Sequence, residues 1–126
     1  MLKKARSIRE FRRYAVHFTE GDIATIMAPK QPFHHFYYVL GEGGEPCGFA
    51  RIDYVLGAEQ AVIAVIVLDP VAQVDLDRGA LLEALADRAR KLGAAVVAVD
   101  HRGEAEPLTQ RGWTVEQVTY RLSRVL

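Results

Sequence analysis

Two groups of ionisable side chains in this sequence are suited to proton transfer. Glu59 stands just before an apolar run at residues 61–68, and Asp100 with His101 follows a second apolar run at residues 94–99. Carboxylates and imidazoles are the usual general bases, and ligands bind at the carboxyl ends of parallel strands. Glu59 and His101 are therefore the candidate bases. For His101, an ordinary exposed loop histidine is the alternative interpretation.

Other reactive residue types occur in less informative patterns. His34 and His35 are adjacent, so on a helix or a strand they point to different faces, which disfavours joint binding of a metal. Cys47 lies beside a turn without a neighbour that would activate a thiol, and we interpret it as an ordinary residue. A single cysteine excludes an internal disulfide and a cysteine-based zinc site.

The composition indicates one domain spanning residues 1–126. Half of the 126 residues are apolar, which is enough for one core and too little for two. Lys plus Arg equals Asp plus Glu at 16 each, which argues against nucleic acid as a partner. The apolar runs are far shorter than the roughly 18 residues of a membrane span. Together with the single cysteine, these features predict a cytoplasmic protein without a membrane partner.

The candidate bases flank a predicted strand, helix and strand. The run at residues 61–68 is rich in β-branched residues, as in a strand buried on both faces, and residues 94–99 form a similar run. Between them, residues 77–92 have the period of a helix, with Gly93 as its stop. The apolar positions of this helix share one stripe: Leu81, Leu85, Ala89 and Leu92. Short links then make the two strands parallel in a right-handed crossover.

The remaining elements are predicted on both sides of this unit. Residues 1–13 are basic and have helical apolar spacing, so we expect a terminal amphipathic helix, with residues 1–11 as a basic extension. Prolines 29 and 32 end a short helix that begins near Glu20. The other predicted elements are strands at residues 14–18 and 115–122, a hairpin at 36–40 and 49–56, and a short helix at 104–110.

The central segment resembles a known family. A strand, Pro70, a loop and the helical sequence ALLEALADRARKLGA look like the acyl-CoA-binding core of the GNAT (GCN5-related N-acetyltransferase) family. Arg111-Gly112-Trp113 is similar to the Gly-Phe step that follows the last helix of that family. The resemblance implies a GNAT-like α/β (α+β) acyl-CoA N-acyltransferase fold, with a mixed twisted sheet of about six strands and flanking helices. It also implies transfer of an acetyl group from acetyl-CoA to an amine.

The resemblance further implies a loop that holds the diphosphate of acetyl-CoA. In the family this loop reads Arg/Gln-x-x-Gly-x-Gly/Ala, because the backbone must approach the anion closely and offer N–H donors. Gln73 takes the Arg/Gln position, and Arg78 and Gly79 are the implied phosphate contacts. The main-chain groups of Val67 and Leu68 are the implied contacts of the pantetheine arm.

Several positions of this segment depart from the family pattern. Leu76 and Arg78 stand where the two glycines belong, and three aspartates that repel an anion lie in or beside the loop: Asp69, Asp75 and Asp77. Independently of any ligand, Asp77 is expected to cap the helix. Thr109 occupies the position of the tyrosine that protonates the departing thiolate in the family, and its hydroxyl is too weak an acid for that role.

Three functional hypotheses remain open. The first is an N-acetyltransferase that acts on an amine of a small molecule or protein. The second is a catalytically inactive GNAT-derived binding or regulatory module that has lost acetyl-CoA use. The third is an interaction protein whose basic segment, residues 1–13, binds an acidic protein or nucleic acid. An exposed sheet edge also leaves self-association as a homodimer open.

Overall fold

The fold is that of a computed structural model, which describes residues 1–5, 20–21, 24, 31–100 and 106–114. Its sheet has five strands in chain order: β1 (Leu2–Lys4), β2 (His34–Leu40), β3 (Pro46–Asp53), β4 (Gln60–Leu68) and β5 (Val96–Val99). Neighbouring strands are antiparallel except for the parallel pair β4 and β5. Three helices follow β4 in the chain: α3 (Pro70–Asp75), α4 (Arg78–Leu92) and, after β5, α5 (Glu106–Thr109).

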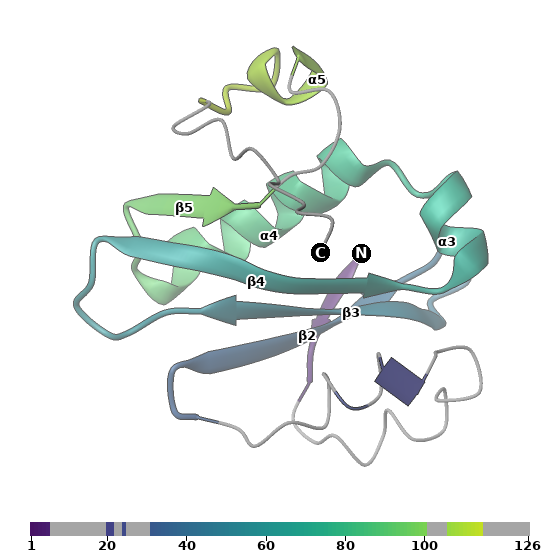
Figure 1. The fold of residues 1–126 in the computed structure, drawn as a ribbon, viewed down its shortest axis with the longest axis horizontal. Coiled ribbons are helices and arrows are strands. Elements are labelled where there is room, and N and C mark those ends of the chain that lie inside the picture. Colours follow the sequence, from purple (N-terminus) through teal and green to yellow (C-terminus); the bar gives the residue numbers. More distant parts are fainter. Residues whose placement is uncertain (6–19, 22–23, 25–30, 101–105, 115–126) are drawn as a thin grey trace, which may run out of the picture.

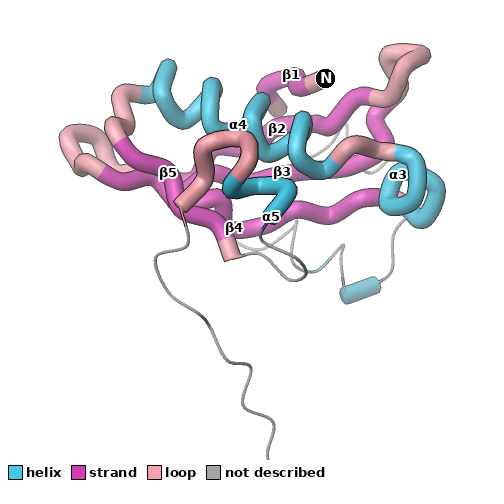
Figure 2. The backbone as a smooth tube through the Cα atoms, turned by 90° about the horizontal axis from the view of Figure 1, so that it is seen from above, coloured by secondary structure: helices cyan, strands magenta, loops and turns pink. Residues whose placement is uncertain are grey.

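Helix α4 lies across one face of the sheet and builds the main core (Figures 1 and 2). The carboxylate of Asp77 accepts a hydrogen bond from the Ala80 amide at 3.1 Å, which starts the helix. Gly93, with φ of 117°, ends it in the left-handed conformation. The apolar stripe then packs on the sheet, where Leu92 is partly buried and the other core residues of the helix are buried: Leu81, Leu82, Leu85 and Ala89.

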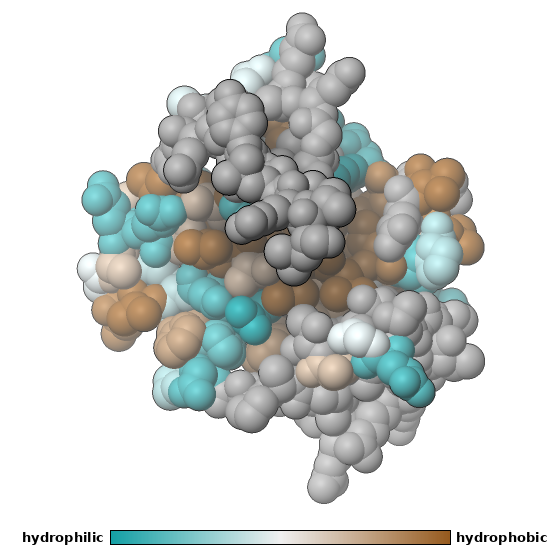
Figure 3. Space-filling view, in the orientation of Figure 1, coloured by the Kyte–Doolittle hydropathy of each residue, from teal (hydrophilic) through white to brown (hydrophobic). Residues whose placement is uncertain are grey.

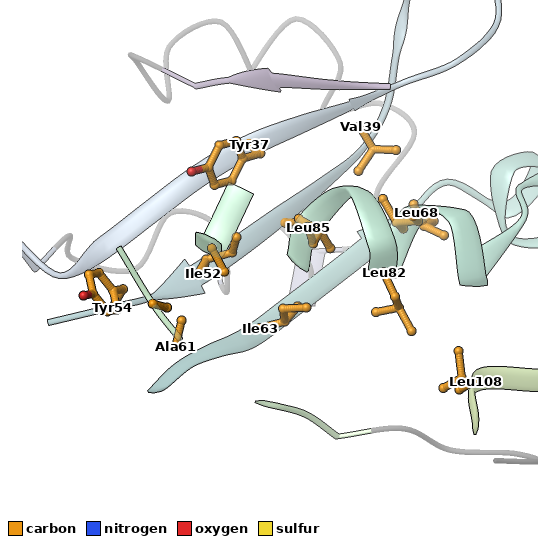
Figure 4. Packing of buried hydrophobic residues seen from close by; sticks show 14 of the residues in the cluster. Tyr37, Val39, Ile52, Tyr54, Ala61, Ile63, Leu68, Leu82, Leu85 and Leu108 are labelled. Atoms are coloured by element: carbon orange, nitrogen blue, oxygen red, sulfur yellow. The ribbon is translucent and has the colours of Figure 1, made fainter. Parts of the chain in front are cut away.

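The two faces of the sheet carry separate buried clusters because side chains alternate along each strand. On the α4 face, residues such as Tyr37, Ile52 and Ile63 pack against Leu82 and Leu85 (Figure 4). The opposite face holds an aromatic cluster whose members are Phe36, Tyr38 and Phe49, with Ala5 beside them. Figure 3 also shows hydrophobic atoms at the surface of α3 and of the β3–β4 turn, where Val71, Val74, Val55 and Leu56 are exposed.

The predicted strand–helix–strand unit and hairpin are confirmed. Helix α4 covers the predicted range, β4 and β5 are parallel, and β2 and β3 form the antiparallel hairpin. Helix α5 lies within the short helix expected at residues 104–110. The predicted strands at 14–18 and 115–122 lie outside the described residues, so the sheet is described with five strands. Within the described ranges, no helix combines the length and apolar character that a membrane span requires.

The prediction of an amphipathic helix at residues 1–13 is wrong for its first residues. Residues Leu2–Lys4 form β1 and pair with the edge of β2, in register with Tyr37–Val39. Hydrogen bonds continue beyond the strand, from the Ala5 amide to the Phe36 carbonyl at 2.9 Å. The helical spacing of Leu2 and Ala5 misleads here because an available strand edge supplies backbone partners that outweigh local propensity. These residues therefore belong to the sheet and not to an extension outside it.

Candidate cofactor site

The two parallel strands separate halfway along β4. Strand β5 pairs with β4 from Gln60↔Val96 to Ile63↔Val99, whereas β4 continues to Leu68. In the described part of the chain, the second half of β4 thus has no β5 residue beside it (Figure 1). A break of this kind between parallel strands opens one edge of β4 to a ligand.

A β-bulge lies at the point of separation. Arg51 is paired with Val65 and Ile52 with Ile63, so Ala64 is an extra residue on β4. A bulge bends its strand and increases the local twist. The bend at Ala64 directly follows the last pair of β4 with β5, which explains why the two strands diverge there.

The main-chain groups of β4 alternate between the two edges of the strand. The amide of Asp69 donates to the Cys47 carbonyl of β3 at 2.9 Å, so in the antiparallel ladder the main chain of Val67 also faces β3. Consistent with this, the Val67 carbonyl oxygen lies 2.7 Å from the position that a Cβ on Gly48 would take. Ile66 and Leu68 therefore direct their main-chain groups away from β3. The main chain of Val67 thus faces β3 and not the diverging edge at which its ligand contact was predicted, and Ile66 and Leu68 face that edge.

The segment after β4 is a short helix and not an open loop. Asp69 accepts a hydrogen bond from the Ala72 amide at 2.8 Å, Pro70 occupies the first turn, and the Leu76 amide donates to the Ala72 carbonyl. Gln73 lies within this helix, α3. The sequence does contain the signal, since Asp-Pro is a favourable N-cap followed by a favourable first helical residue. The Ala72 and Leu76 amides thus bond within this helical segment, and α3 contains no glycine that would let a diphosphate approach the backbone closely.

The beginning of α4 is occupied by an arginine and two carboxylates. Asp77 uses Oδ1 to cap the helix, and its Oδ2 lies 3.2 Å from an Arg111 guanidinium nitrogen. A second guanidinium nitrogen of Arg111 lies 3.2 Å from Glu83 Oε2. A Cβ on Gly79 would lie 2.8 Å from Arg111 Nε, so this arginine covers Gly79. Arg78, at the first position of α4, is exposed.

Of the two candidate bases, the described Glu59 is not brought together with these residues. Glu59 is exposed at the start of β4, and its carbonyl accepts hydrogen bonds from the Ala95 and Val96 amides. The nine residue-to-residue steps from Glu59 to Leu68 correspond to roughly 30 Å of extended strand. Glu59 therefore lies at the opposite end of β4 from α3 and the start of α4. His101 lies outside the described residues, and the preceding Asp100 is exposed.

Two further residues can be placed by their electrostatics. Burial, reinforced by the carboxylate of Asp69, raises the pKa of the Cys47 thiol, as expected of an ordinary cysteine. Burial and the nearby Lys4 ammonium lower the pKa of His35. Both effects disfavour the charged form, so they favour a protonated Cys47 thiol and a neutral His35 imidazole.

One polar group of the site is not evident from the sequence. His34, Arg51 and Asp53 meet on the sheet face opposite α4, and Asp53 is paired in register with Val62 beside the point where β5 diverges. The two-residue spacing of Arg51 and Asp53 on a strand was the available signal, because it places both on one face. His34 joins them only through the register of β2 with β3.

The architecture matches solved structures of GNAT acetyltransferases. No family model and no curated protein matches the sequence. A GNAT family acetyltransferase from Staphylococcus aureus aligns with a TM-score of 0.66 at 8% identity, covering 98% of each chain. An aminoglycoside acetyltransferase from an uncultured soil sample aligns at 0.64 and 15% identity, over 100% of this chain and 98% of that one.

A third similar structure contains a cofactor analogue. AAC(6')-Iy in complex with the bisubstrate analog CoA-S-monomethyl-acetylneamine aligns with a TM-score of 0.57 at 15% identity, over 99% of this chain and 98% of that one. At these identities the likeness establishes the fold. The chain thus has the GNAT acetyltransferase fold, as the sequence predicts.

Proposed function

We propose that the protein is an N-acetyltransferase that transfers the acetyl group of acetyl-CoA to an amine of a small molecule or protein. The observation that carries this proposal is the separation of β5 from β4 after Ile63, with the bulge at Ala64. The separation directs the main chain of Ile66 toward a gap between two parallel strands. An extended pantetheine arm fits such an edge because its amide groups can hydrogen-bond to a strand.

At the start of α4, the described cations that could meet a diphosphate are the exposed Arg78 and Arg111. Asp77 caps the helix and places a negative charge where a diphosphate would lie, which opposes a second anion. Arg111 lies over Gly79, and a guanidinium binds phosphate oxygens bidentately. Arg111 would therefore have to exchange its contacts with Asp77 and Glu83 for phosphate.

Acetyl transfer requires few chemical groups from the protein. Acetyl-CoA would supply a thioester whose acetyl carbon is attacked by a neutral amine, with release of CoA as the thiol. The protein has to hold the two reactants and accept a proton from the amine. His101, after the end of β5, stays the predicted base for this role.

A second function is favoured by the same helix start. The carboxylate of Asp77 and the guanidinium of Arg111 pair where the family resemblance implies a diphosphate, and Thr109 replaces the expected tyrosine. A binding or regulatory module without acyl transfer needs neither a free diphosphate position nor a general acid. The two functions differ in whether acetyl-CoA binds.

Calorimetric titration of the full chain with acetyl-CoA tests the proposal. We expect micromolar binding, strengthened about three- to tenfold by Asp77→Asn, which retains a capping oxygen and removes the charge. Asp87→Asn is the matched control, because Asp87 pairs with Arg90 and Lys91 further along the same helix. Absence of binding in both the wild type and Asp77→Asn would exclude the transferase and leave the regulatory module.

A further inference from the structure

Three polar side chains form a cluster on the sheet face opposite α4, and we call them the outer-face cluster: His34, Arg51 and Asp53. In the β2–β3 register His34 is paired with Asp53, and Phe36 with Arg51. Residues paired across antiparallel strands share a face, and so do residues two apart on one strand. The cluster therefore shares its face with the aromatic residues Phe36 and Phe49.

The contacts inside the cluster fix the carboxylate of Asp53. Arg51 Nε lies 2.8 Å from Asp53 Oδ1, and Arg51 Nη2 lies 3.1 Å from Oδ2, so the pair is bidentate. His34 Nδ1 accepts a hydrogen bond from the Gln31 amide at 3.2 Å. The neutral ring then carries its proton on Nε2, which faces Asp53 Oδ1 at 3.7 Å. This separation is too long for a direct hydrogen bond and leaves Oδ1 able to accept another donor.

The partial burial of the cluster costs desolvation free energy. The side chains of His34, Arg51 and Asp53 are only 12%, 21% and 24% exposed. The rings of Phe33 and Phe36 lie 4.5 and 6.1 Å from the imidazole, centroid to centroid. Taking an ion pair out of water gives little or no net stability compared with apolar residues of similar size. A binding role accounts for the cluster better than a contribution to folding does.

The cluster also lies beside the separation of β4 and β5. Asp53 is paired with Val62, which directly precedes Ile63, the last β4 residue paired with β5. Neighbouring strands are about 5 Å apart, so Asp53 is one strand away from the gap. Helix α4 covers the other face, whereas Val62 is 40% exposed on this one. A second substrate that approaches the gap from this face passes Asp53.

We propose that Asp53 binds the amine group of the acyl acceptor, with Arg51 and His34 as positioning residues. This inference rests on the proposed function. A carboxylate oxygen accepts hydrogen bonds from an amine, whereas an anionic acceptor would meet an arginine already engaged by Asp53. The guanidinium beside a bound ammonium also disfavours its charged form. The Asp53 carboxylate itself favours the charged form, so a separate base has to supply the neutral amine that attacks a thioester.

The test uses n-butylamine as the probe and amide NMR of the full chain, with n-butanol as the uncharged reference ligand. We expect saturable shifts at Val62 and around the outer-face cluster with the amine, and none with the alcohol. Asp53→Asn should weaken the amine at least about tenfold, because a charge-assisted hydrogen bond is lost. Asp87→Asn should bind it like the wild type, and the Kd for acetyl-CoA should be the same in all three proteins.

The double variant Arg51→Met/Asp53→Leu provides a second measurement should Asp53→Asn fail to fold. It replaces the ion pair by apolar side chains, so we expect a folded protein that no longer binds the amine. Unchanged amine binding in either variant overturns the inference while leaving acetyl-CoA binding intact. Loss of acetyl-CoA binding in the wild type, with amine binding still dependent on Asp53, would instead refute the proposed function and retain the amine site.

Discussion

The two faces of the sheet are built on different principles, as the adjacent residues His34 and His35 illustrate. His35 points to the α4 face, where burial and Lys4 lower its pKa. His34 points to the opposite face, where it meets the Arg51–Asp53 pair. The α4 face closes on apolar side chains, while the opposite face combines aromatic rings with charged groups. The first arrangement stabilises the fold, and the second retains polar atoms that a ligand can use.

The largest difference between the faces should come from a core residue of α4. Leu85 is fully buried in the main core, so Leu85→Ala should lower the free energy of unfolding by about 2–5 kcal/mol. Urea denaturation followed by circular dichroism measures this loss. Val71→Ala is the control, because Val71 is 69% exposed and its truncation should change stability by less than about 0.5 kcal/mol. A small loss at Leu85 would mean that α4 does not supply the main core.

The outer-face cluster should behave differently in single and double variants. Asp53→Ala leaves Arg51 without its carboxylate and should cost about 1–3 kcal/mol. The double variant Arg51→Met/Asp53→Leu removes both charges and should stay within about 1 kcal/mol of the wild type. The same denaturation measurements give both values. A double variant as unstable as Asp53→Ala would show that the ion pair serves folding, and the contrast between the faces would disappear.

His35 should make stability depend on pH. Because its pKa is lowered in the folded state, the unfolded chain takes up a proton more readily, near the ordinary value of 6.5. The associated stability is complete above about pH 6.5 and is lost as the pH falls below it. Urea unfolding at pH 7.5 and 5.5 should show a smaller decrease for His35→Gln than for the wild type. If His34→Gln reduced the loss of stability at pH 5.5 as much as His35→Gln or more, the pH dependence would originate on the opposite face.

The smallest effect is expected for the exposed counterpart of Arg51. Arg111 pairs with Asp77 and Glu83, but these three side chains are 36%, 60% and 50% exposed. Arg111→Ala should therefore cost less than about 1 kcal/mol, and less again in high salt. Melting temperatures at low and high ionic strength measure the change. A loss of stability that is independent of salt and as large as that of Asp53→Ala would contradict this prediction. It would mean that the ion pairs of Arg51 and Arg111 contribute equally to stability despite their different exposure.

The sequence predicts those parts of the fold that depend on local patterns. The stripe of Leu81, Leu85 and Ala89 and the capping residue Asp77 define α4, and β-branched runs define β4 and β5. The short helix α3 was also encoded, by Asp69 before Pro70, but the same dipeptide ends a strand. Strand β1 could not be predicted from its own residues, because its conformation depends on the edge of β2.

The candidate site was less accessible to sequence reasoning because it depends on register. Whether the main chain of Val67 or of Ile66 faces the diverging edge depends on the hydrogen-bonding register of β4 with β3. The bond from the Asp69 amide to the Cys47 carbonyl shows this register, and hydrophobic periodicity does not predict it. Arg111 covers Gly79 and pairs with Asp77, although Asp77 and Arg111 are 34 residues apart in the chain. His34 and Asp53 likewise meet only once β2 and β3 are paired. Periodicity identifies a face but not the neighbour across it.

Strand β1 has a consequence for the order of folding. It is three residues long, and its partner β2 starts about 30 residues later in the chain. Pairing therefore costs the entropy of joining two distant segments and gains few hydrogen bonds. We expect β1 to join the sheet late and its amides to exchange with solvent before those of β3 and β4. Each opening exposes the edge of β2 from Phe36 to Leu40, which is rich in aromatic side chains and forms a template for intermolecular pairing. We therefore expect the pairing of Leu2–Lys4 with β2 to lower the tendency of the protein to aggregate.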